Sequence, residues 1–413
     1  MATEVVKVVD PDNGSGTDYT SLSAWEAGQQ QNLVTNDKIA VAKCRCTGGT
    51  ADTTALTIDG WTTDSTRYIK IWTDPSESYR HSGKWETGNK YRVSISANTA
   101  IDFNVYNLVI EGLQIELKNS GDMNQCIAIK NWYQNWPSSG SVTISKCVLK
   151  GEKNLSSSSN FHEGVGLWDQ SGSGGSNLKF YIVNCVAYGF KRGDTYCCGF
   201  DFDRGSGNSS GYIYNCTAYD CSYGHVCYSG QMKAINCIAN QCTTDFYLSA
   251  GSWLSGSGYH ATDKTAAGSG APGSNNRYEQ TISFVDASGG DFHLQSSDSG
   301  ARNYGTSLSS DGDYPFSDDI DGQTRSGTWD IGADEYVTSV TLTQEGYRFR
   351  NDDGSESGAT WKASQDTNIN LPANTAARLR ILIDGSDDPD SANYQLEARL
   401  KPSGGSFGPW YKV

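Results

Sequence analysis

The chain has 413 residues, of which 47 are acidic and 32 basic, and its formal net charge at pH 7 is −15. Phosphate backbones require clustered lysine and arginine, so this charge argues against a nucleic-acid partner. No run of about 18 apolar residues is present, which argues against membrane insertion, and 46 glycines with 23 tyrosines are typical of a loop-rich β protein.

The N-terminal part predicts a strand, a short helix and then further strands. Residues 5–10 alternate as a strand does, and residues 20–27 have Ser23 and Glu26 at capping-box spacing, with Gly28 as the stop. Such a helix would cover the unpaired edge of a first coil. The N-terminus has no basic or apolar signal region, so we expect no secretion signal. Strand signals follow at 38–42, 55–58, 68–72, 91–96 and 104–117.

One short pattern recurs between residues 180 and 250 and organises the chain. Aligning its Asn-Cys pairs brings together Asn184 with Asn215 and Asn236, and Cys185 with Cys216 and Cys237. An apolar residue precedes each cysteine by three positions (Ile182, Ile213, Ala234), and an alanine follows by two (Ala187, Ala218, Ala239). Looser copies lie at 108–117 and 141–151, with Leu113 and Cys147 in the cysteine position.

The spacing and chemistry of this pattern predict a parallel β-helix. The intervals between cysteines are unequal (185 − 147 = 38, 216 − 185 = 31, 237 − 216 = 21), as in a solenoid whose insertions are confined to loops. The unit alternates apolar and polar residues and leaves no room for a crossover helix, so its copies must stack as parallel strands. We expect the asparagines to form a hydrogen-bonded ladder between coils. The stacked cysteines fit disulfide geometry poorly, so we expect buried free thiols.

The C-terminal part predicts a second, smaller domain. Residues 251–280 are rich in glycine and serine, and short strands resume over 281–336. Further strand signals lie near 346–351, 358–363, 376–384 and 393–400. The predicted domains are therefore 1–338, a β-helix with an N-terminal cap, and 339–413, a small antiparallel β-sandwich.

Three aspartates are candidate catalytic residues. Aligning the second strands of successive coils places Asp169 over Asp203, with Asp201 two positions earlier on the same face. Separations of about 4.8 and 6.6 Å would bracket the carboxyl spacings of glycosidases. The same three residues could hold Ca²⁺; alternatively, they are solvent-facing residues before turns. Neighbours in register that could tune the cluster are Glu163, Arg204 and His225.

Aromatic residues are candidates for glycan binding, because aromatic side chains on solenoid loops can stack on sugar rings. The candidates are Trp132, Tyr133, Trp136 and Trp168. The alternative is that they cover the loop bases. Only five scattered histidines and no paired Cys-x-x-Cys motif are present, which argues against a zinc site. A second acidic set is predicted to form turns: Asp318, Asp319, Asp321, Asp330, Asp334 and Glu335.

Three stretches resemble the pectate-lyase-like right-handed parallel β-helix proteins, in particular those of bacteriophage virions. VVKVVDPDNGSGTDYTSLSAWEAG at 5–28 is similar to the opening segment of such helices, and SDDIDGQTRSGTWDIGADEY at 317–336 to their final segment. YRFRNDDGSESGATWKASQDTNINL at 347–371 resembles a small β-domain of phage-like proteins. The fold itself hosts lyases, hydrolases, adhesins and inert struts.

The resemblance implies a structural protein of a phage-like virion, such as a tail fibre, a spike or a capsid decoration protein. It would act as a surface-exposed strut or as a glycan- or receptor-binding module, made in the host cytoplasm without an export signal. Its partners would be other virion proteins and a host-surface glycan, and by analogy to spikes it would form a trimer. The alternative is a polysaccharide lyase or glycoside hydrolase that uses the aspartate cluster. No cofactor is expected apart from Ca²⁺.

Overall fold

A computed structural model of the chain describes residues 2–96, 99–118, 125–133, 139–152, 161–169, 177–191, 197–203, 209–337 and 342–351, together with 353, 358, 360–370, 372, 377–385, 397–398 and 411–412. The chain divides into two compact units, Met1–Tyr336 and Val337–Val413. Within the described residues, no helix has the length and apolar character that crossing a membrane requires.

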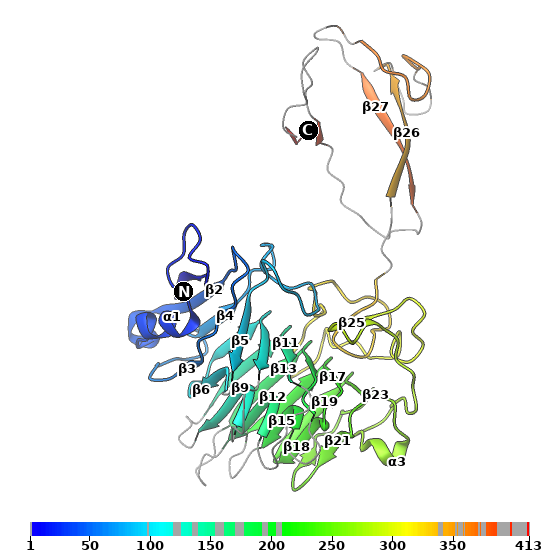
Figure 1. Cartoon of the computed structure of the whole chain (residues 1–413). Coiled ribbons are helices and arrows are strands. Elements are labelled where there is room, and N and C mark those ends of the chain that lie inside the picture. Colours follow the sequence, from blue (N-terminus) through cyan, green and yellow to red (C-terminus); the bar gives the residue numbers. More distant parts are fainter. Residues whose placement is uncertain are drawn as a thin grey trace. The chain divides into compact units, whose positions relative to one another are not determined.

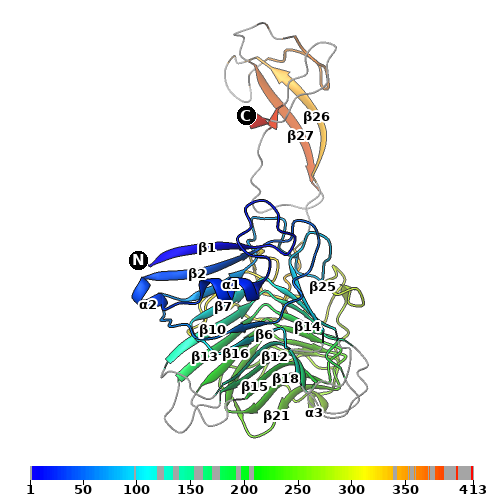
Figure 2. The same ribbon diagram turned by 60° about the vertical axis from the view of Figure 1, so that its left-hand side comes forward.

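The first unit is a parallel β-helix built from three sheets, so the predicted fold is confirmed (Figures 1 and 2). The first sheet contains β1 (Thr3–Val9), β2 (Lys38–Cys44), β4 (Ile69–Trp72), β7 (Leu108–Glu111), β10 (Ser139–Ser145), β13 (Asn177–Val183), β16 (Ser210–Tyr214), β19 (Gln231–Ile235) and β22 (Ser252–Trp253). The second contains β5 (Arg92–Ser96), β8 (Gln114–Lys118), β11 (Val148–Lys150), β14 (Val186–Tyr188), β17 (Thr217–Tyr219), β20 (Ile238–Asn240) and β23 (Ala261–Thr262). The third contains β3 (Leu56–Ile58), β6 (Ile101–Phe103), β9 (Gln125–Tyr133), β12 (Phe161–Asp169), β15 (Cys197–Asp203), β18 (Tyr223–Ser229) and β21 (Thr244–Leu248).

The strand register confirms the repeat that the sequence predicts. Ile182 pairs with Ile213 and Ile213 with Ala234, while Ala187, Ala218 and Ala239 pair across the second sheet. The cysteines therefore occupy one position on successive coils, and the backbone N–H of Cys185 lies 3.5 Å from the Sγ of Cys216. All twelve cysteines are free and buried, as expected. Ten of them, including Cys185 and Cys216, fill the narrow interior as small apolar groups.

The asparagine ladder differs from the prediction. Asn184, Asn215 and Asn236 have φ values of 52, 50 and 54°, a left-handed conformation that asparagine tolerates well. The amides of Asn215 and Asn236 do lie 3.1 Å apart. However, Asn184 donates to the carbonyl of Asp318 at 2.8 Å and Asn236 to that of Thr306 at 2.8 Å. The amides thus mainly bind a later stretch of chain, which supplies the hydrogen bonds that a coil-to-coil ladder would have used.

A helix covers the first coil, as predicted, and Figure 2 shows it beside β1 and β2. The helix α1 (Leu22–Gln29) buries Leu22 and Trp25, and a second short helix, α2 (Leu33–Asn36), follows. The predicted capping box is wrong: the cap is Ser21, whose hydroxyl accepts from the N–H of Ala24 at 3.1 Å. Glu26 instead accepts from the indole N–H of Trp61 at 3.0 Å.

The stretch of residues 282–336, here called the closing segment, covers two of the three sheets from outside. After the short helix α3 (Ala266–Ser269) it forms the hairpin β24 (Phe284–Asp286) and β25 (Asp291–Leu294). Its apolar residues pack on the second sheet, including Ile238, and on the first sheet, including Tyr214. Within the described residues, no comparable apolar layer packs on the outer face of the third sheet.

The second unit contains small antiparallel sheets. Strands β26 (Leu342–Arg350) and β27 (Arg378–Gly385) pair antiparallel, as do β28 (Glu397–Ala398) and β29 (Tyr411–Lys412). The strand predicted near 358–363 is reduced to a single bridge between Arg350 and Trp361 in the described residues. Most of the strand predicted near 393–400 lies outside the described residues. An antiparallel C-terminal sheet is therefore confirmed, while the second layer of a sandwich stays a prediction.

Candidate functional site on the third sheet

Side chains of the third sheet alternate between the interior and an outer face. Val165 and Phe200 point into the core and are register partners, as are Leu167 and Phe202. The residues between them belong to the outer face, where Gly166 lies beside Asp201. Because the closing segment covers the other two sheets, this outer face is where a ligand would reach the solenoid.

Three potential ligand side chains meet on this face and form what we call the outer cluster: Glu163 of β12 with Cys198 and Asp201 of β15. One donor atom of each lies within 4.8 Å of the others. Glu163 is only 1% exposed. Its carboxylate occupies the space above Gly166, where an added Cβ would lie 2.0 Å from Oε2. The absence of a side chain at Gly166 therefore allows the outer cluster to form.

The carboxylates of the outer cluster have few partners. Both oxygens of Glu163 and Oδ1 of Asp201 are buried without a hydrogen-bond partner in the described part of the chain. Burial, and then the charge of Asp201, raises the pKa of Glu163 well above its usual range. Burial, and then the charge of Asp203, raises the pKa of Asp201 to about 8. In the absence of a bound cation, this pair therefore retains protons at neutral pH.

Charged neighbours surround the outer cluster without neutralising it. Lys130 lies beside Gly166 on the preceding coil, and its Nζ pairs with Asp102 at 3.2 Å. The carboxylate of Asp203 accepts a hydrogen bond from the hydroxyl of Ser229. Lys130 lowers the pKa of Glu163, but burial and the charges of Asp201 and Asp203 raise it by more.

The predicted aspartate cluster is shifted by one residue. Trp168, not Asp169, is the register partner of Asp203, and Asp169 pairs with Tyr133 on the preceding coil. A slip of one residue exchanges the two faces of a strand, so Asp169 does not stack on Asp203. Asp201 and Asp203 do lie on one face, and Glu163 joins them.

His225 does not belong to the site. It is fully buried in the core, where its ring stacks on Phe200 and Phe246 at centroid distances of 5.4 and 4.9 Å. Its Nε2 lies 2.9 Å from the carbonyl of Ile238, and burial lowers its pKa to about 4. It is a neutral core residue. Arg204, the other predicted neighbour, lies outside the described residues.

The predicted aromatic residues are only partly described. Trp132 and Trp168 are register partners on adjacent coils, and Trp168 is half-buried. The side chains of Trp132 and Tyr133, and the whole of Trp136, lie outside what the structure describes.

Three further tyrosines, which the sequence did not predict as site residues, lie on the same sheet. Tyr228 and Tyr247 are 37% and 36% exposed, and the rings of Tyr223 and Tyr247 lie 5.2 Å apart. Tyr223 is the register partner of Cys198. The signal that could have found them is their place in the strands that align with the aspartates.

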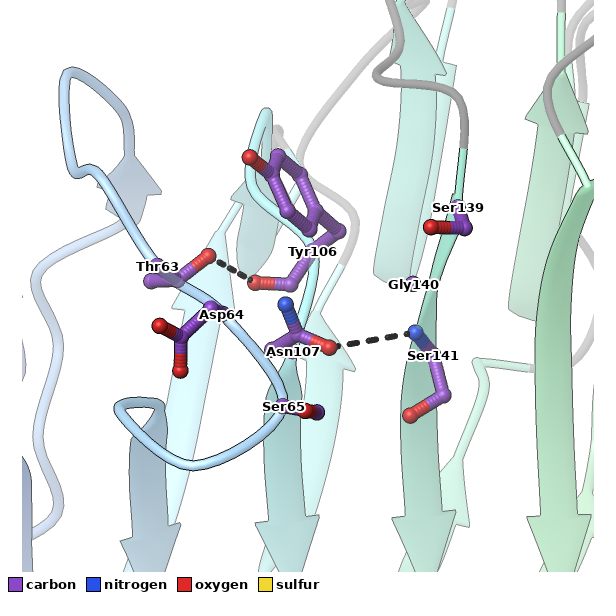
Figure 3. A pocket seen from close by; sticks show the side chains of 8 residues that line it. All are labelled: Thr63, Asp64, Ser65, Tyr106, Asn107, Ser139, Gly140 and Ser141. Atoms are coloured by element: carbon purple, nitrogen blue, oxygen red, sulfur yellow. Dashed lines mark hydrogen bonds between the residues drawn. The ribbon is translucent and has the colours of Figure 1, made fainter. Parts of the chain in front are cut away.

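A separate pocket of about 450 Å³ lies at the start of strands β7 and β10 (Figure 3). Tyr106 stands over it, and the Thr63 hydroxyl donates to the Tyr106 carbonyl at 2.7 Å. Asn107 accepts from the N–H of Ser141 at 3.4 Å, and Asp64 pairs with Arg67 at 2.9 Å. Since these groups hold the surrounding loop, the pocket offers weaker support for a site than the third sheet does.

Of the acidic residues of the closing segment, Asp319 forms a turn, as predicted, whereas Asp334 and Glu335 bind more distant groups, the N–H of Leu294 at 2.7 Å and the guanidinium of Arg325 at 3.2 Å. Asp319 accepts from the N–H groups of Asp321 and Gln323, and Asp330 accepts from that of Tyr336 at 2.7 Å. His293 lies between carboxylates, with Nδ1 2.5 Å from Asp291 and Nε2 3.0 Å from Asp321. Both ring nitrogens of His293 have carboxylate partners, so this histidine links two parts of the closing segment by ion pairs.

Comparisons with known proteins give only a distant likeness. No family model and no curated protein matches the chain. Two solved structures of the pectin methylesterase from Aspergillus niger, in differently deglycosylated forms, align with 71% of this chain. One is 10% identical over 89% of its own length with a TM-score of 0.29, and the other 11% identical over 92% with a TM-score of 0.30. These values carry no argument about activity.

Proposed function

We propose that the protein is a surface component of a phage-like virion whose β-helix binds a glycan along the outer face of the third sheet. The observation that carries this proposal is the gathering of exposed tyrosines beside the carboxylates of the outer cluster, on the sheet that the closing segment leaves uncovered. Aromatic faces stack on sugar rings, and carboxylates accept hydrogen bonds from sugar hydroxyls.

The charge of the chain indicates which glycans suit this face. With a net charge of −15 and the carboxylate of Asp203 on the same face of the sheet, an anionic polysaccharide would be repelled unless a cation bridged the two. The proposed ligand is therefore a neutral glycan of a host cell surface.

The second unit is proposed as the part that attaches to another virion protein or to copies of this chain, including a trimer. Its strand β27 exposes Leu379, Ile381 and Leu382, the last of these 56% exposed. A unit of this size buries only a marginal core by itself, so association through this strand would stabilise it.

A second candidate function is hydrolysis of a glycosidic bond on the same face. The raised pKa of Asp201, about 8, favours this function. A carboxyl group with that pKa is protonated at neutral pH and can act as a general acid. Donor oxygens of Glu163 and Asp201 lie within 4.8 Å, nearer to the spacing of retaining than of inverting glycosidases, about 5–5.5 and 6.5–9.5 Å.

Binding and turnover can be measured with one panel of neutral, capsular and pectic polysaccharides. For binding, we expect the double variant Tyr228→Ala/Tyr247→Ala to lose at least about tenfold in affinity, or about 1.4 kcal/mol. Tyr304→Ala is the matched control, because Tyr304 is 44% exposed and lies on the closing segment. Equal affinity of the double variant and the control would refute the glycan surface.

The release of reducing ends or unsaturated product separates hydrolysis or lyase activity from binding alone. Turnover that is lost in Asp201→Asn, while affinity is retained, would establish the second candidate in place of a passive binding surface. No turnover on any polysaccharide of the panel leaves binding as the function.

A further inference from the structure

We propose that the outer cluster binds one divalent metal ion of the zinc class between Glu163, Cys198 and Asp201. This inference does not depend on glycan binding, because it follows from the ligand atoms themselves.

The geometry brings the three ligands together from two adjacent coils. Glu163 and Cys198 are register partners on β12 and β15, and Asp201 follows Cys198 on the same strand. All three donor atoms lie within 4.8 Å of one another, so small movements of side chains would bring them to a common ion. No linear metal-binding motif exists, which is why sequence analysis did not predict the site.

The environment of Glu163 points independently to a cation site. The residue is 1% exposed, and neither carboxylate oxygen has a hydrogen-bond partner among the described residues. A buried carboxylate without a partner is costly, by several kcal/mol even after relaxation. A metal ion at the outer cluster would place a positive charge directly against the Glu163 oxygens, which accept no hydrogen bond among the described residues.

The donor set selects the kind of metal. A thiolate with two carboxylates suits Zn²⁺, which takes sulfur at about 2.3 Å and carboxylate oxygen at about 2.0–2.2 Å. Calcium and magnesium prefer oxygen alone. Three protein ligands leave the fourth position of a tetrahedral zinc site for water or another small ligand.

The surrounding charges are compatible with a cation. Asp203 adds a further carboxylate on β15, and Tyr223 of β18 lies beside Cys198. The ammonium group of Lys130 is held by Asp102 at 3.2 Å. Cys198 lies on the outer face of its sheet. Cys185 and Cys216 instead lie in the coil interior, where their Sγ atoms are 3.3 Å from the backbone carbonyls of Val183 and Tyr214.

The test is a metal titration of the full chain after treatment with a chelator. We expect one equivalent of Zn²⁺ or Co²⁺ to bind, Co²⁺ to produce a thiolate charge-transfer absorption, and Ca²⁺ to fail to compete. Zn²⁺ should also raise the melting temperature of the wild-type chain. Cys198→Ala should abolish the absorption, whereas Cys197→Ala, which removes the adjacent buried thiol, should retain it.

Glu163→Gln keeps the shape of the side chain, so a loss of metal binding in this variant cannot be attributed to misfolding. This variant should fold, lose at least about tenfold in affinity for Zn²⁺, and show no metal-induced rise in melting temperature. Absence of the absorption in the wild-type chain, or its survival in Cys198→Ala, would overturn the proposal. A wild-type chain that binds no metal while Glu163→Gln alters only the pH dependence of stability would instead show a pair of carboxyl groups sharing a proton.

Discussion

The guanidinium group of Arg325 joins several parts of the closing segment to one another and also bonds Asn184 of the solenoid, so its removal should be among the most destabilising substitutions. The side chain is fully buried and pairs with Glu335 at 3.2 Å. It also donates to the carbonyls of Gly332 and Ala333 at 3.0 and 2.9 Å, and to the amide oxygen of Asn184 at 3.2 Å.

Arg325→Met keeps most of the side-chain volume and removes every one of these hydrogen bonds. It leaves Glu335, itself 5% exposed, as a buried carboxylate without its cation. Removing one partner of a buried ion pair costs about 3–5 kcal/mol, and the carbonyls that lose donors place the effect towards the upper end of that range. Trp329 is also buried, with its ring centre 5.5 Å from the guanidinium carbon, so its fluorescence reports local detachment.

Urea unfolding followed by circular dichroism and tryptophan fluorescence measures the loss. The matched control is Arg277→Met, because Arg277 is partly exposed, stacks on Tyr304 at 3.2 Å and bonds two carbonyls of the closing segment. We expect the control to cost less than about 1 kcal/mol. If the unfolding free energy of Arg325→Met lies within about 1 kcal/mol of wild type, or equals that of the control, the buried ion pair does not stabilise the closing segment.

Two further predictions concern the thiols and the ion-paired histidine. A thiol reagent should find no reactive cysteine in the folded chain and twelve after denaturation, because all twelve are free and buried; a lower count in denaturant would reveal disulfides. Burial disfavours the charged form of His293, but hydrogen bonds to Asp321 and Asp291 outweigh it and raise its pKa to about 10. Since the unfolded value is about 6.5, its stabilisation should be complete below pH 6.5 and lost as pH rises towards 10. In His293→Gln, the free energy of unfolding should therefore depend less on pH between 6.5 and 10. An unchanged pH dependence would contradict the raised pKa of His293.

The sequence was sufficient for the coils and insufficient for the site. The Asn-Cys repeat predicts the register of Ile182, Ile213 and Ala234 because a constant core position must recur on every coil. On the third sheet the pattern is weaker, and the predicted register places Asp169 beside Asp203, where the structure has Trp168. In addition, the register between β15 and β18 shifts next to Asp203, so its partner is Ser229.

The outer cluster depends on features that no linear pattern contains. Glu163 and Gly166 share a face, although strict alternation would put residues three apart on opposite faces. The space for the Glu163 carboxylate comes from a missing side chain, and its partner Cys198 belongs to another coil. The asparagines likewise look equivalent in sequence but bind different parts of a segment that lies 70 or more residues later.

The closing segment changes how the solenoid should come apart. In a simple repeat protein each coil touches only its neighbours, so coils can fray from an end one after another. Here one stretch of chain runs outside many coils: Lys84 pairs with Asp291 at 3.1 Å, Lys146 pairs with Asp318, and Asn236 bonds Thr306. Early and late coils are thereby bound to the same closing segment. The first unit should therefore unfold in one cooperative transition. During synthesis, its coils can reach their final stability only after the last residues of the closing segment have left the ribosome.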